Sequence, residues 1–212
     1  MFLSRVEINP HLSKTMWTLA SPQRMHAIVA ASFPSAQDAE GRVLWRLDRL
    51  GPAQYILVQS SVKPDFTHLI EQLGWPQSGQ QWETREYGSF LKALEEGQRW
   101  RFRLCANPTH SVKALGNGRR GKLLACGSAN HQKEWLEAHA KRCGFNLTSF
   151  ELIGRDLLRF QRKSEIVTLG VAVFEGTLEI ESADTLRGAM MTGIGRAKAY
   201  GCGLLTLARV GE

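Results

Sequence analysis

In the first half of the chain, some segments have the hydrophobic periodicity of β-strands and others have that of α-helices. Residues 2–8 alternate apolar and polar side chains, which predicts an opening strand. Ser21 followed by Pro22 is typical of a helix start, and the apolar stripe behind it ends near Pro34. The next patterns predict strands over 42–48 and 54–59, a helix over 65–73 and a weaker strand over 81–86.

The second half starts after a linker or short helix over 87–97, and a strictly alternating strand is expected over 99–107. Residues 110–127 contain four glycines and four basic residues, so a loop is expected there. The remaining patterns predict a helix over 131–142, long strands over 150–160 and 167–180, a helix over 184–192 and a closing strand over 204–208.

Each half thus follows the order strand, helix, strand, strand, helix, strand, which is that of a ferredoxin-like unit. We therefore expect an α+β protein with two tandem ferredoxin-like (RRM-like) βαββαβ domains, over 1–90 and 98–212. The segment 161–165, Gln-Arg-Lys-Ser-Glu, joins the two long strands of the second domain and predicts a protruding basic hairpin.

Composition limits the class of protein. Hydrophobic residues make up 43% of the chain and charged residues 22%, as in ordinary globular proteins. The apolar stretches are too short to cross a bilayer and the N-terminus lacks the layout of a secretory signal, so we expect a cytoplasmic protein with no membrane partner. The cysteines lack C-x-x-C spacing and no histidine pair has metal-site spacing, so we expect neither a metal nor another cofactor.

Positive charge is concentrated in one part of the chain. The formal net charge is +7, and residues 99–163 hold 14 lysines or arginines against 4 acidic residues. Such density favours a polyphosphate partner, because each neutralised phosphate releases condensed counterions. A solvated basic face is the alternative interpretation of the same charge.

A glycine-rich segment lies between the last predicted helix and the closing strand. Gly193, Gly195, Gly201 and Gly203 enclose Arg196 and Lys198, so backbone N–H groups could approach a phosphate while the side chains supply charge. It is neither a Walker A loop nor a dinucleotide fingerprint, both of which follow a strand and precede a helix. A tight turn that needs positive φ is the alternative.

This segment resembles the C-terminal signature of CRISPR RNA-processing endoribonucleases. Together with Phe-Glu-Gly at 174–176 upstream, it is most similar to the CasE (Cse-type) family, which belongs to type I-E Cascade. Shorter similarities follow in the same order at 2–6, 19–26, 44–47, 57–60 and 102–108, so the resemblance spans nearly the whole chain. It implies metal-independent cleavage of a CRISPR repeat stem-loop. It also implies that the product stays bound, with other Cascade subunits as partners.

RNA can be cut without a metal because its own 2′-OH can attack the adjacent phosphorus, giving a cyclic phosphate and expelling the 5′-oxygen. The protein must align these atoms, move protons and stabilise negative charge. Histidine, with an ordinary pKa of about 6.5, suits the proton transfer. His26 is the candidate, because it lies in the first turns of a helix, about 100° from Met25 at the edge of the apolar stripe.

The family resemblance supports His26, since the catalytic histidine of the family occupies this position; a histidine packed at a domain boundary is the alternative. Members of the family often carry a tyrosine three residues earlier and a lysine five residues later, where this chain has Gln23 and Ala31. We therefore consider Gln23, Arg24 and Lys198 as possible catalytic support. These differences leave open a non-catalytic CRISPR RNA-binding subunit, and an RRM-like protein of general RNA metabolism is a weaker third hypothesis.

RNA binding is expected to depend on the basic residues of the second domain, with Arg159 and Lys163 the strongest candidates because the family grips its repeat with a basic hairpin here. Double-stranded RNA is recognised mainly by shape and phosphate contacts, so these residues should set affinity more than sequence choice. The candidates are Lys113, Arg119, Arg120, Lys122, Arg155, Arg159, Arg162, Lys163, Arg196 and Lys198.

Overall fold

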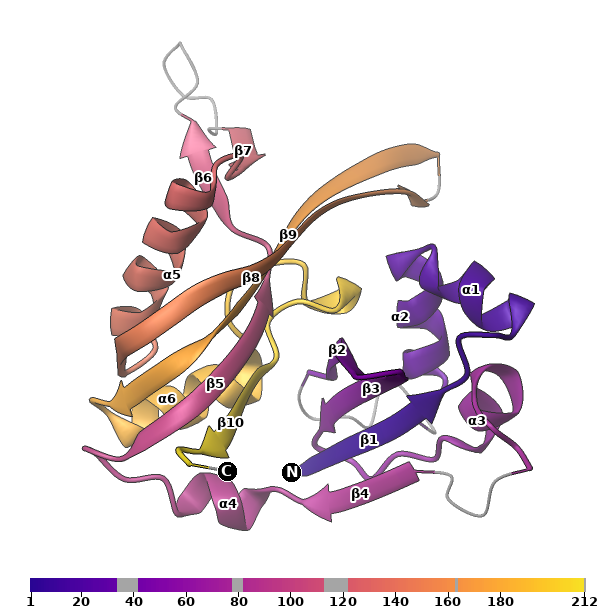
Figure 1. The fold of residues 1–212 in the computed structure, drawn as a ribbon, viewed down its shortest axis with the longest axis horizontal. Coiled ribbons are helices and arrows are strands. Elements are labelled where there is room, and N and C mark those ends of the chain that lie inside the picture. Colours follow the sequence, from indigo (N-terminus) through magenta and orange to yellow (C-terminus); the bar gives the residue numbers. More distant parts are fainter. Residues whose placement is uncertain (34–41, 78–81, 113–121, 163, 212) are drawn as a thin grey trace.

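The computed structural model describes residues 1–33, 42–77, 82–112, 122–162 and 164–211. Two four-stranded antiparallel sheets lie next to each other, each with helices packed on one face (Figure 1). The first sheet has the strand order β2-β3-β1-β4. Its strands and helices are β1 Phe2–Ile8, α1 Ser13–Leu19, α2 Pro22–Ala30, β2 Leu44–Leu50, β3 Ala53–Ser60, α3 Thr67–Leu73 and β4 Trp82–Glu86.

The second sheet has the corresponding order β10-β5-β9-β8 and follows the short helix α4 Gly88–Lys92. A separate two-stranded sheet pairs β6 with β7. The elements of this half are β5 Arg99–Ala106, β6 Thr109–Val112, β7 Lys122–Ala125, α5 Ala129–Arg142, β8 Phe145–Arg162, β9 Glu165–Ile180, α6 Ala183–Thr192, the 3₁₀ turn η1 Lys198–Tyr200 and β10 Leu205–Arg209.

Both sheets therefore have the fourth, first, third and second strand of their half side by side. Helices follow the first strand and the third strand of each half, and in the first half both α1 and α2 follow the first strand. This is the ferredoxin-like arrangement, so the predicted fold class is confirmed. Alternation sets which side chains enter the cores. In the first sheet Val6, Ile8, Ile56 and Val58 are buried against Met25 of α2 and its neighbours.

Two features differ from the expectation. Helix α1 was not predicted, because its helical pattern is short and it has no capping side-chain hydrogen bond. The loop expected over 110–127 is wrong at its ends, where β6 and β7 pair in register from Thr109↔Ala125 to Val112↔Lys122. The glycines and basic residues between them favoured a loop, and residues 113–121 lie outside the described residues.

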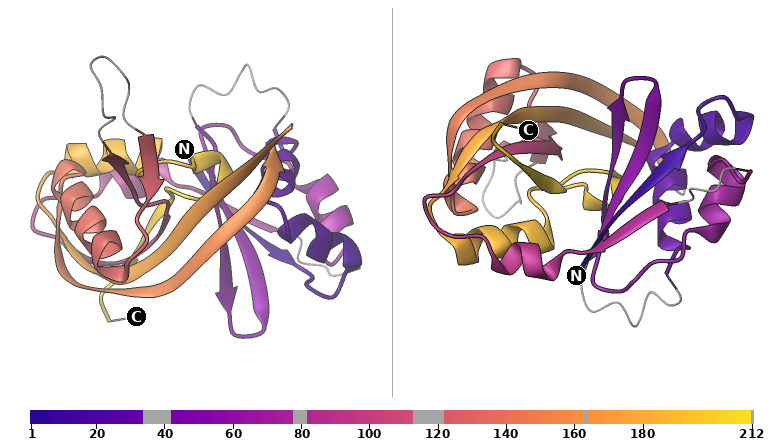
Figure 2. Two further views of the ribbon diagram at one scale, coloured as in Figure 1. Left: turned by 90° about the horizontal axis from the view of Figure 1, so that it is seen from above. Right: turned by 60° about the horizontal axis from the view of Figure 1, so that its bottom comes forward.

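The β8–β9 hairpin is longer than its sheet, with strands of 18 and 16 residues paired out to Arg162↔Glu165. Register shifts after Leu147 and Leu152 accompany its strong curvature, because bulges increase local twist. The hairpin arches from the second domain toward α2 of the first (Figures 1 and 2). Phe160 on its underside packs with buried Cys202 and so fixes the arch over the glycine-rich segment.

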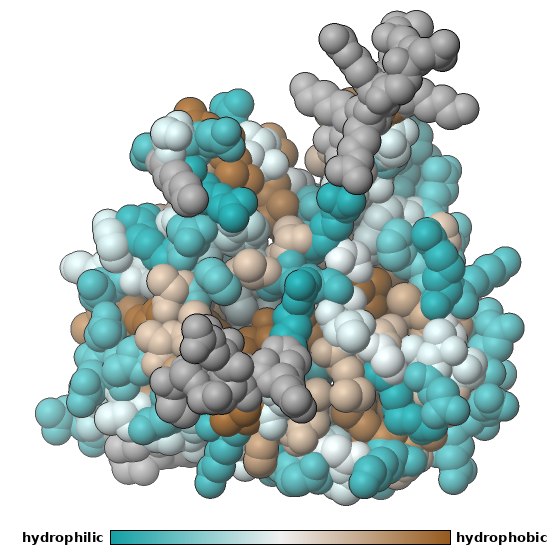
Figure 3. Space-filling model, turned by 180° about the vertical axis from the view of Figure 1, so that it is seen from behind, coloured by the Kyte–Doolittle hydropathy of each residue, from teal (hydrophilic) through white to brown (hydrophobic). Residues whose placement is uncertain are grey.

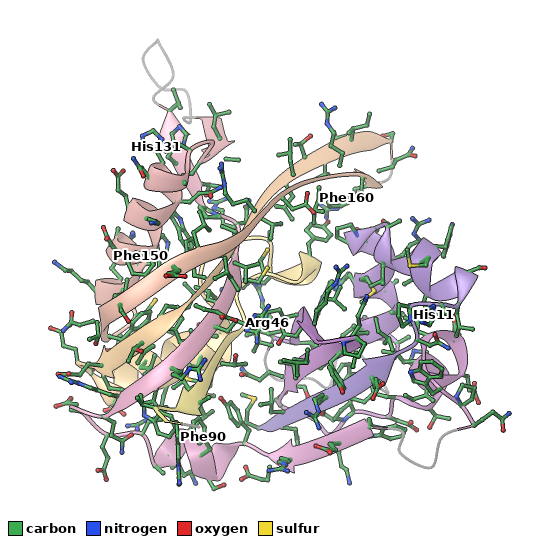
Figure 4. All side chains as sticks on the ribbon, viewed as in Figure 1. His11, Arg46, Phe90, His131, Phe150 and Phe160 are labelled. Carbon is green, nitrogen blue, oxygen red and sulfur yellow. The ribbon has the colours of Figure 1, made fainter. Side chains whose placement is uncertain are left out.

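Arg46 holds the two domains together (Figure 4). Its side chain is buried, forms two hydrogen bonds of 2.8 Å with the carboxylate of Asp48, and donates to the carbonyls of Arg103 and Leu204 and to the hydroxyl of Thr206. A buried guanidinium is tolerated only when it is paired and its N–H groups have acceptors. These contacts therefore fix the orientation of β2 against β5 and β10.

On the surface, hydrophilic residues form most of the outline seen from behind, and less polar ones gather toward the middle (Figure 3). Among the described residues, no helix has the length and apolar character that crossing a membrane requires.

Candidate functional site

A cavity of about 550 Å³ lies where α2, η1 and the end of the β8–β9 hairpin meet. Its wall combines apolar side chains of the first domain with polar side chains from both domains. None of the described residues that line it is acidic, so the cavity suits an anionic ligand. The polar lining consists of His26, Arg42, Arg162, Lys198 and Tyr200; the apolar lining includes Val29, Phe33, Val43 and Trp45.

His26 reaches the cavity because of its position on α2. The helix begins at Pro22 after extended Ser21, and it buries Met25, Ile28 and Val29 against the first sheet. His26 lies beside that buried stripe and is partly exposed, as its helical angle predicted. No hydrogen bond joins its ring to another of the described residues.

Tyr200 brings a hydroxyl to the same place from the other end of the chain. Its Oη donates to Oε1 of Gln23 at 3.3 Å, and Gln23 lies one helical turn before His26 on the same side of α2. The Phe160 ring meets the Tyr200 ring edge to face with 4.8 Å between centroids. The sequence analysis missed Tyr200; its signal was a lone aromatic hydroxyl within a segment of small residues.

The glycine-rich segment forms the turns that position this hydroxyl. All four of its glycines have positive φ, from 78° to 95°, and Ala197 has φ 57°. A Cβ on Gly201 would lie 2.9 Å from the indole of Trp45, so the turn also needs glycine to pack on the first domain. The turn interpretation therefore accounts for the glycines themselves, while the side chains at 198 and 200 line the cavity.

Lys198 stands in the cavity wall near Arg42. Partial burial lowers the pKa of Lys198, and the positive charge of Arg42 lowers it further. Both effects oppose the charged ammonium. A bound phosphate would reverse this balance, since a nearby negative charge favours the protonated amine.

The model of the protein family described as CRISPR associated protein matches residues 1–209 of the chain. The CRISPR-associated endoribonuclease Cse3 of Thermus thermophilus is 30% identical over 226 residues, which cover 98% of this chain and 100% of the relative. The chain belongs to this family of CRISPR-associated endoribonucleases, and it is of the Cse3 (CasE) type.

Chains in solved structures share its fold. The structure of Thermus thermophilus Cse3 bound to an RNA representing a pre-cleavage complex has a TM-score of 0.81 to this chain, with 28% identity and 98% of each chain covered. A chain of a CRISPR RNA-guided surveillance complex, pre-nicking, has a TM-score of 0.69 at 24% identity, over 99% of this chain and 100% of that one. The second likeness concerns the fold alone.

The other candidate residues of this Cse3-type chain are distributed around the cavity rather than in it. Arg24 does not line the cavity, and its guanidinium stacks 3.9 Å from the ring centroid of Trp17 on α1. Arg196 is exposed and also lies outside the lining. Arg42, which the sequence did not single out, is a cation that does line the cavity.

The basic residues of the hairpin lie on two faces. Arg162 shares the face of Phe160 and lines the cavity, whereas Arg155 and Arg159 are exposed on the opposite face, as strand alternation requires. Arg155 donates to the carbonyl of Gly127. Lys113, Arg119, Arg120 and Lys163 lie outside the described residues, and Lys122 is described only as part of β7.

The described residues contain no group of three or more histidines, cysteines, aspartates or glutamates that could hold a metal ion. Two of the other histidines lie away from the cavity lining. His131 is at the start of α5, and His11 is at the far side of the first domain (Figure 4).

Proposed function

We propose that the chain cleaves CRISPR repeat transcripts at their stem-loop, with the RNA 2′-OH as nucleophile, without a metal, and with His26 as the catalytic proton-transfer residue. The observation that carries this proposal is the gathering of His26 with Arg42, Arg162 and Lys198 around one cavity. Phosphodiester cleavage by a neighbouring hydroxyl requires a group that transfers protons and positive charge that stabilises the phosphorane. A partly exposed imidazole surrounded by cations supplies both.

In this reaction the 2′-oxygen forms a bond to phosphorus while the bond from phosphorus to the 5′-oxygen breaks. His26 takes the proton of the 2′-OH, and the cationic side chains stabilise the charge on the phosphorane. The products are a 2′,3′-cyclic phosphate and a 5′-hydroxyl. Tight positioning matters as much as the groups themselves, because attack must be in line with the leaving oxygen.

Substrate binding in this proposal uses both domains, taken as residues 1–90 and 98–212. The exposed cations of the hairpin outer face, Arg155 and Arg159, contact the phosphates of the repeat stem, and Arg162 reaches the scissile region. The processed RNA stays bound, with other Cascade subunits as partners, in the cytoplasm. The Cse-type family supports this assembly, and a protein of the same fold occurs in a CRISPR RNA-guided surveillance complex.

The decisive experiment compares His26→Ala with the wild-type chain on a repeat hairpin in the presence of EDTA. We expect unchanged hairpin affinity and a cleavage rate lowered about 10²- to 10⁴-fold. His11→Ala is the matched control, since His11 is exposed on the far side of the first domain. Normal cutting by His26→Ala, cutting of a substrate with a 2′-deoxy nucleotide before the scissile phosphate, or a need for magnesium would each contradict the proposal.

The alternative function is a non-catalytic subunit that binds CRISPR RNA. It is favoured by Gln23 and Ala31, which stand where members of the family often have a tyrosine and a lysine. This function predicts tight hairpin binding and no cleavage by the wild-type chain in the same incubation.

A further inference from the structure

Cleavage by the 2′-OH needs two proton transfers, and His26 can serve only one of them in a given step. The second transfer protonates the 5′-oxygen as it leaves. A group for this role must carry a proton at neutral pH and lie within reach of the phosphate that His26 serves. The guanidiniums of Arg42 and Arg162 do not give up protons in proteins. The described lining of the cavity then leaves two candidate donors, the Lys198 ammonium and the Tyr200 hydroxyl.

Three observations favour Tyr200. Its Oη is hydrogen-bonded to Gln23, one turn from His26 on the same helix, so the hydroxyl and the imidazole lie along one side of α2. The packing of Phe160 on its ring restricts its motion. The hydrogen bond of 3.2 Å from the Trp45 indole to the carbonyl of Ala199 holds η1 against the first domain. The hydroxyl is thus held ready before substrate binds, which is how a proton donor becomes efficient.

Lys198 has a different environment. Its neighbour in the cavity is Arg42, a second cation. Two adjacent cations suit the non-bridging oxygens of a phosphate, whose charge they neutralise. This division leaves the neutral hydroxyl as the group that gives up a proton.

Resting on the proposed function, we propose that Tyr200 is the second catalytic residue and donates its phenolic proton to the 5′-oxygen. His26 takes the 2′-OH proton as the new bond from the 2′-oxygen to phosphorus forms and the bond to the 5′-oxygen breaks. The imidazolium then returns its proton to the phenolate through water, which restores both groups. Gln23 orients the hydroxyl and is a positioning residue.

The test uses a repeat hairpin whose scissile 5′-oxygen is replaced by sulfur, because a thiolate leaves without a proton. Single-turnover cleavage is measured in EDTA with saturating protein on the oxygen and the sulfur substrate. We expect the Tyr200→Phe variant to cleave the oxygen substrate about 10²- to 10³-fold more slowly than the wild type. The same variant should cleave the sulfur substrate at nearly the wild-type rate. His26→Ala should be slow on both, since the 2′-OH still needs a base.

Two further variants keep the result interpretable. Gln23→Leu removes the acceptor of the Tyr200 hydroxyl and should slow only the oxygen substrate, by about fivefold, as the loss of one hydrogen bond implies. Tyr55→Phe removes a hydroxyl on β3, outside the cavity lining, and should match the wild type on both substrates.

Equal slowing of both substrates by Tyr200→Phe, or no slowing of either, overturns the role of Tyr200. Rescue of Lys198→Ala by the sulfur substrate, without rescue of Tyr200→Phe, would assign the donor to Lys198 instead. A wild-type rate for His26→Ala on both substrates is a separate outcome, which rejects the proposed function itself.

Discussion

The indole Nε1 of Trp45 donates a hydrogen bond to the backbone carbonyl of Ala199 at 3.2 Å, across 154 residues of sequence. The bond joins the second strand of the first domain to the centre of η1. Gly201 packs closely against the six-membered ring of the same indole. One buried side chain of the first domain therefore sets the position of the turn that carries Lys198 and Tyr200.

Trp45→Phe is predicted to loosen this turn while leaving the first core largely filled. The carbonyl of Ala199 loses its donor, so the free energy of unfolding should fall by about 1–3 kcal/mol. The cleavage rate should fall by a larger factor than the hairpin affinity. The substitution disturbs the positions of the side chains in the cavity, whereas the basic residues that bind the hairpin keep their charge. Urea unfolding and single-turnover cleavage measure the two effects.

The matched control is Trp100→Phe. Trp100 is partly buried and its Nε1 also donates one hydrogen bond, to Gln98 at 3.1 Å, but it lies on β5 outside the cavity lining. The Trp100→Phe variant should have a lower free energy of unfolding, and its cleavage rate should stay near that of the wild type. Equal cleavage defects in the two variants would show that η1 does not depend on the Trp45 bond.

The two faces of the hairpin predict different defects for Arg159 and Arg162. Arg159→Ala should weaken repeat binding and reduce the slope of log affinity against log salt by about one, as the loss of one phosphate contact does. Arg162→Ala should chiefly slow cleavage by saturating protein, since Arg162 lines the cavity. Filter binding at several salt concentrations and single-turnover rates separate them, and the reverse pattern contradicts this division.

Lys198→Ala should weaken hairpin affinity about 10- to 150-fold, because a charge-assisted contact to phosphate is worth about 1.5–3 kcal/mol. Lys198→Arg should recover part of this affinity by keeping the charge. Arg196→Ala, two residues away and outside the cavity lining, should have the smaller effect. Unchanged hairpin affinity in the Lys198→Ala variant would indicate that the glycine-rich segment serves only as a structural turn.

His139 predicts a pH dependence of stability. Its ring stacks on Trp135, with 3.9 Å between centroids, and its Nδ1 lies 2.8 Å from the Trp135 carbonyl; burial lowers the pKa of His139 below its ordinary value of 6.5. Between the folded pKa and 6.5 the unfolded chain binds more protons, so stability falls as pH drops through this window. His139→Gln should flatten that part of a stability profile measured by urea unfolding between pH 7 and 5. An unchanged profile contradicts the assignment.

The local pattern of hydrophobic and polar residues was sufficient to predict most of the helices and strands of the fold. Alternation over 2–8 and 99–107 and the Ser21-Pro22 helix start describe elements that depend on neighbours in the chain, and the structure has them within a few residues of the expected ends. The order of these elements then leaves few sheet topologies. Where glycines and charges outweighed the short apolar runs, as at β6 and β7, the local pattern misled.

The sequence by itself determined the two ferredoxin-like units, the concentration of positive charge and the position of His26 beside the apolar stripe of its helix. Only the tertiary structure decided which side chains share a cavity with His26. Tyr200 and Arg162 arrive from turns and strands more than 100 residues away, and the face each presents depends on positive φ, strand register and the packing of Trp45. Such contacts depend on packing between distant segments, so no local periodicity encodes them.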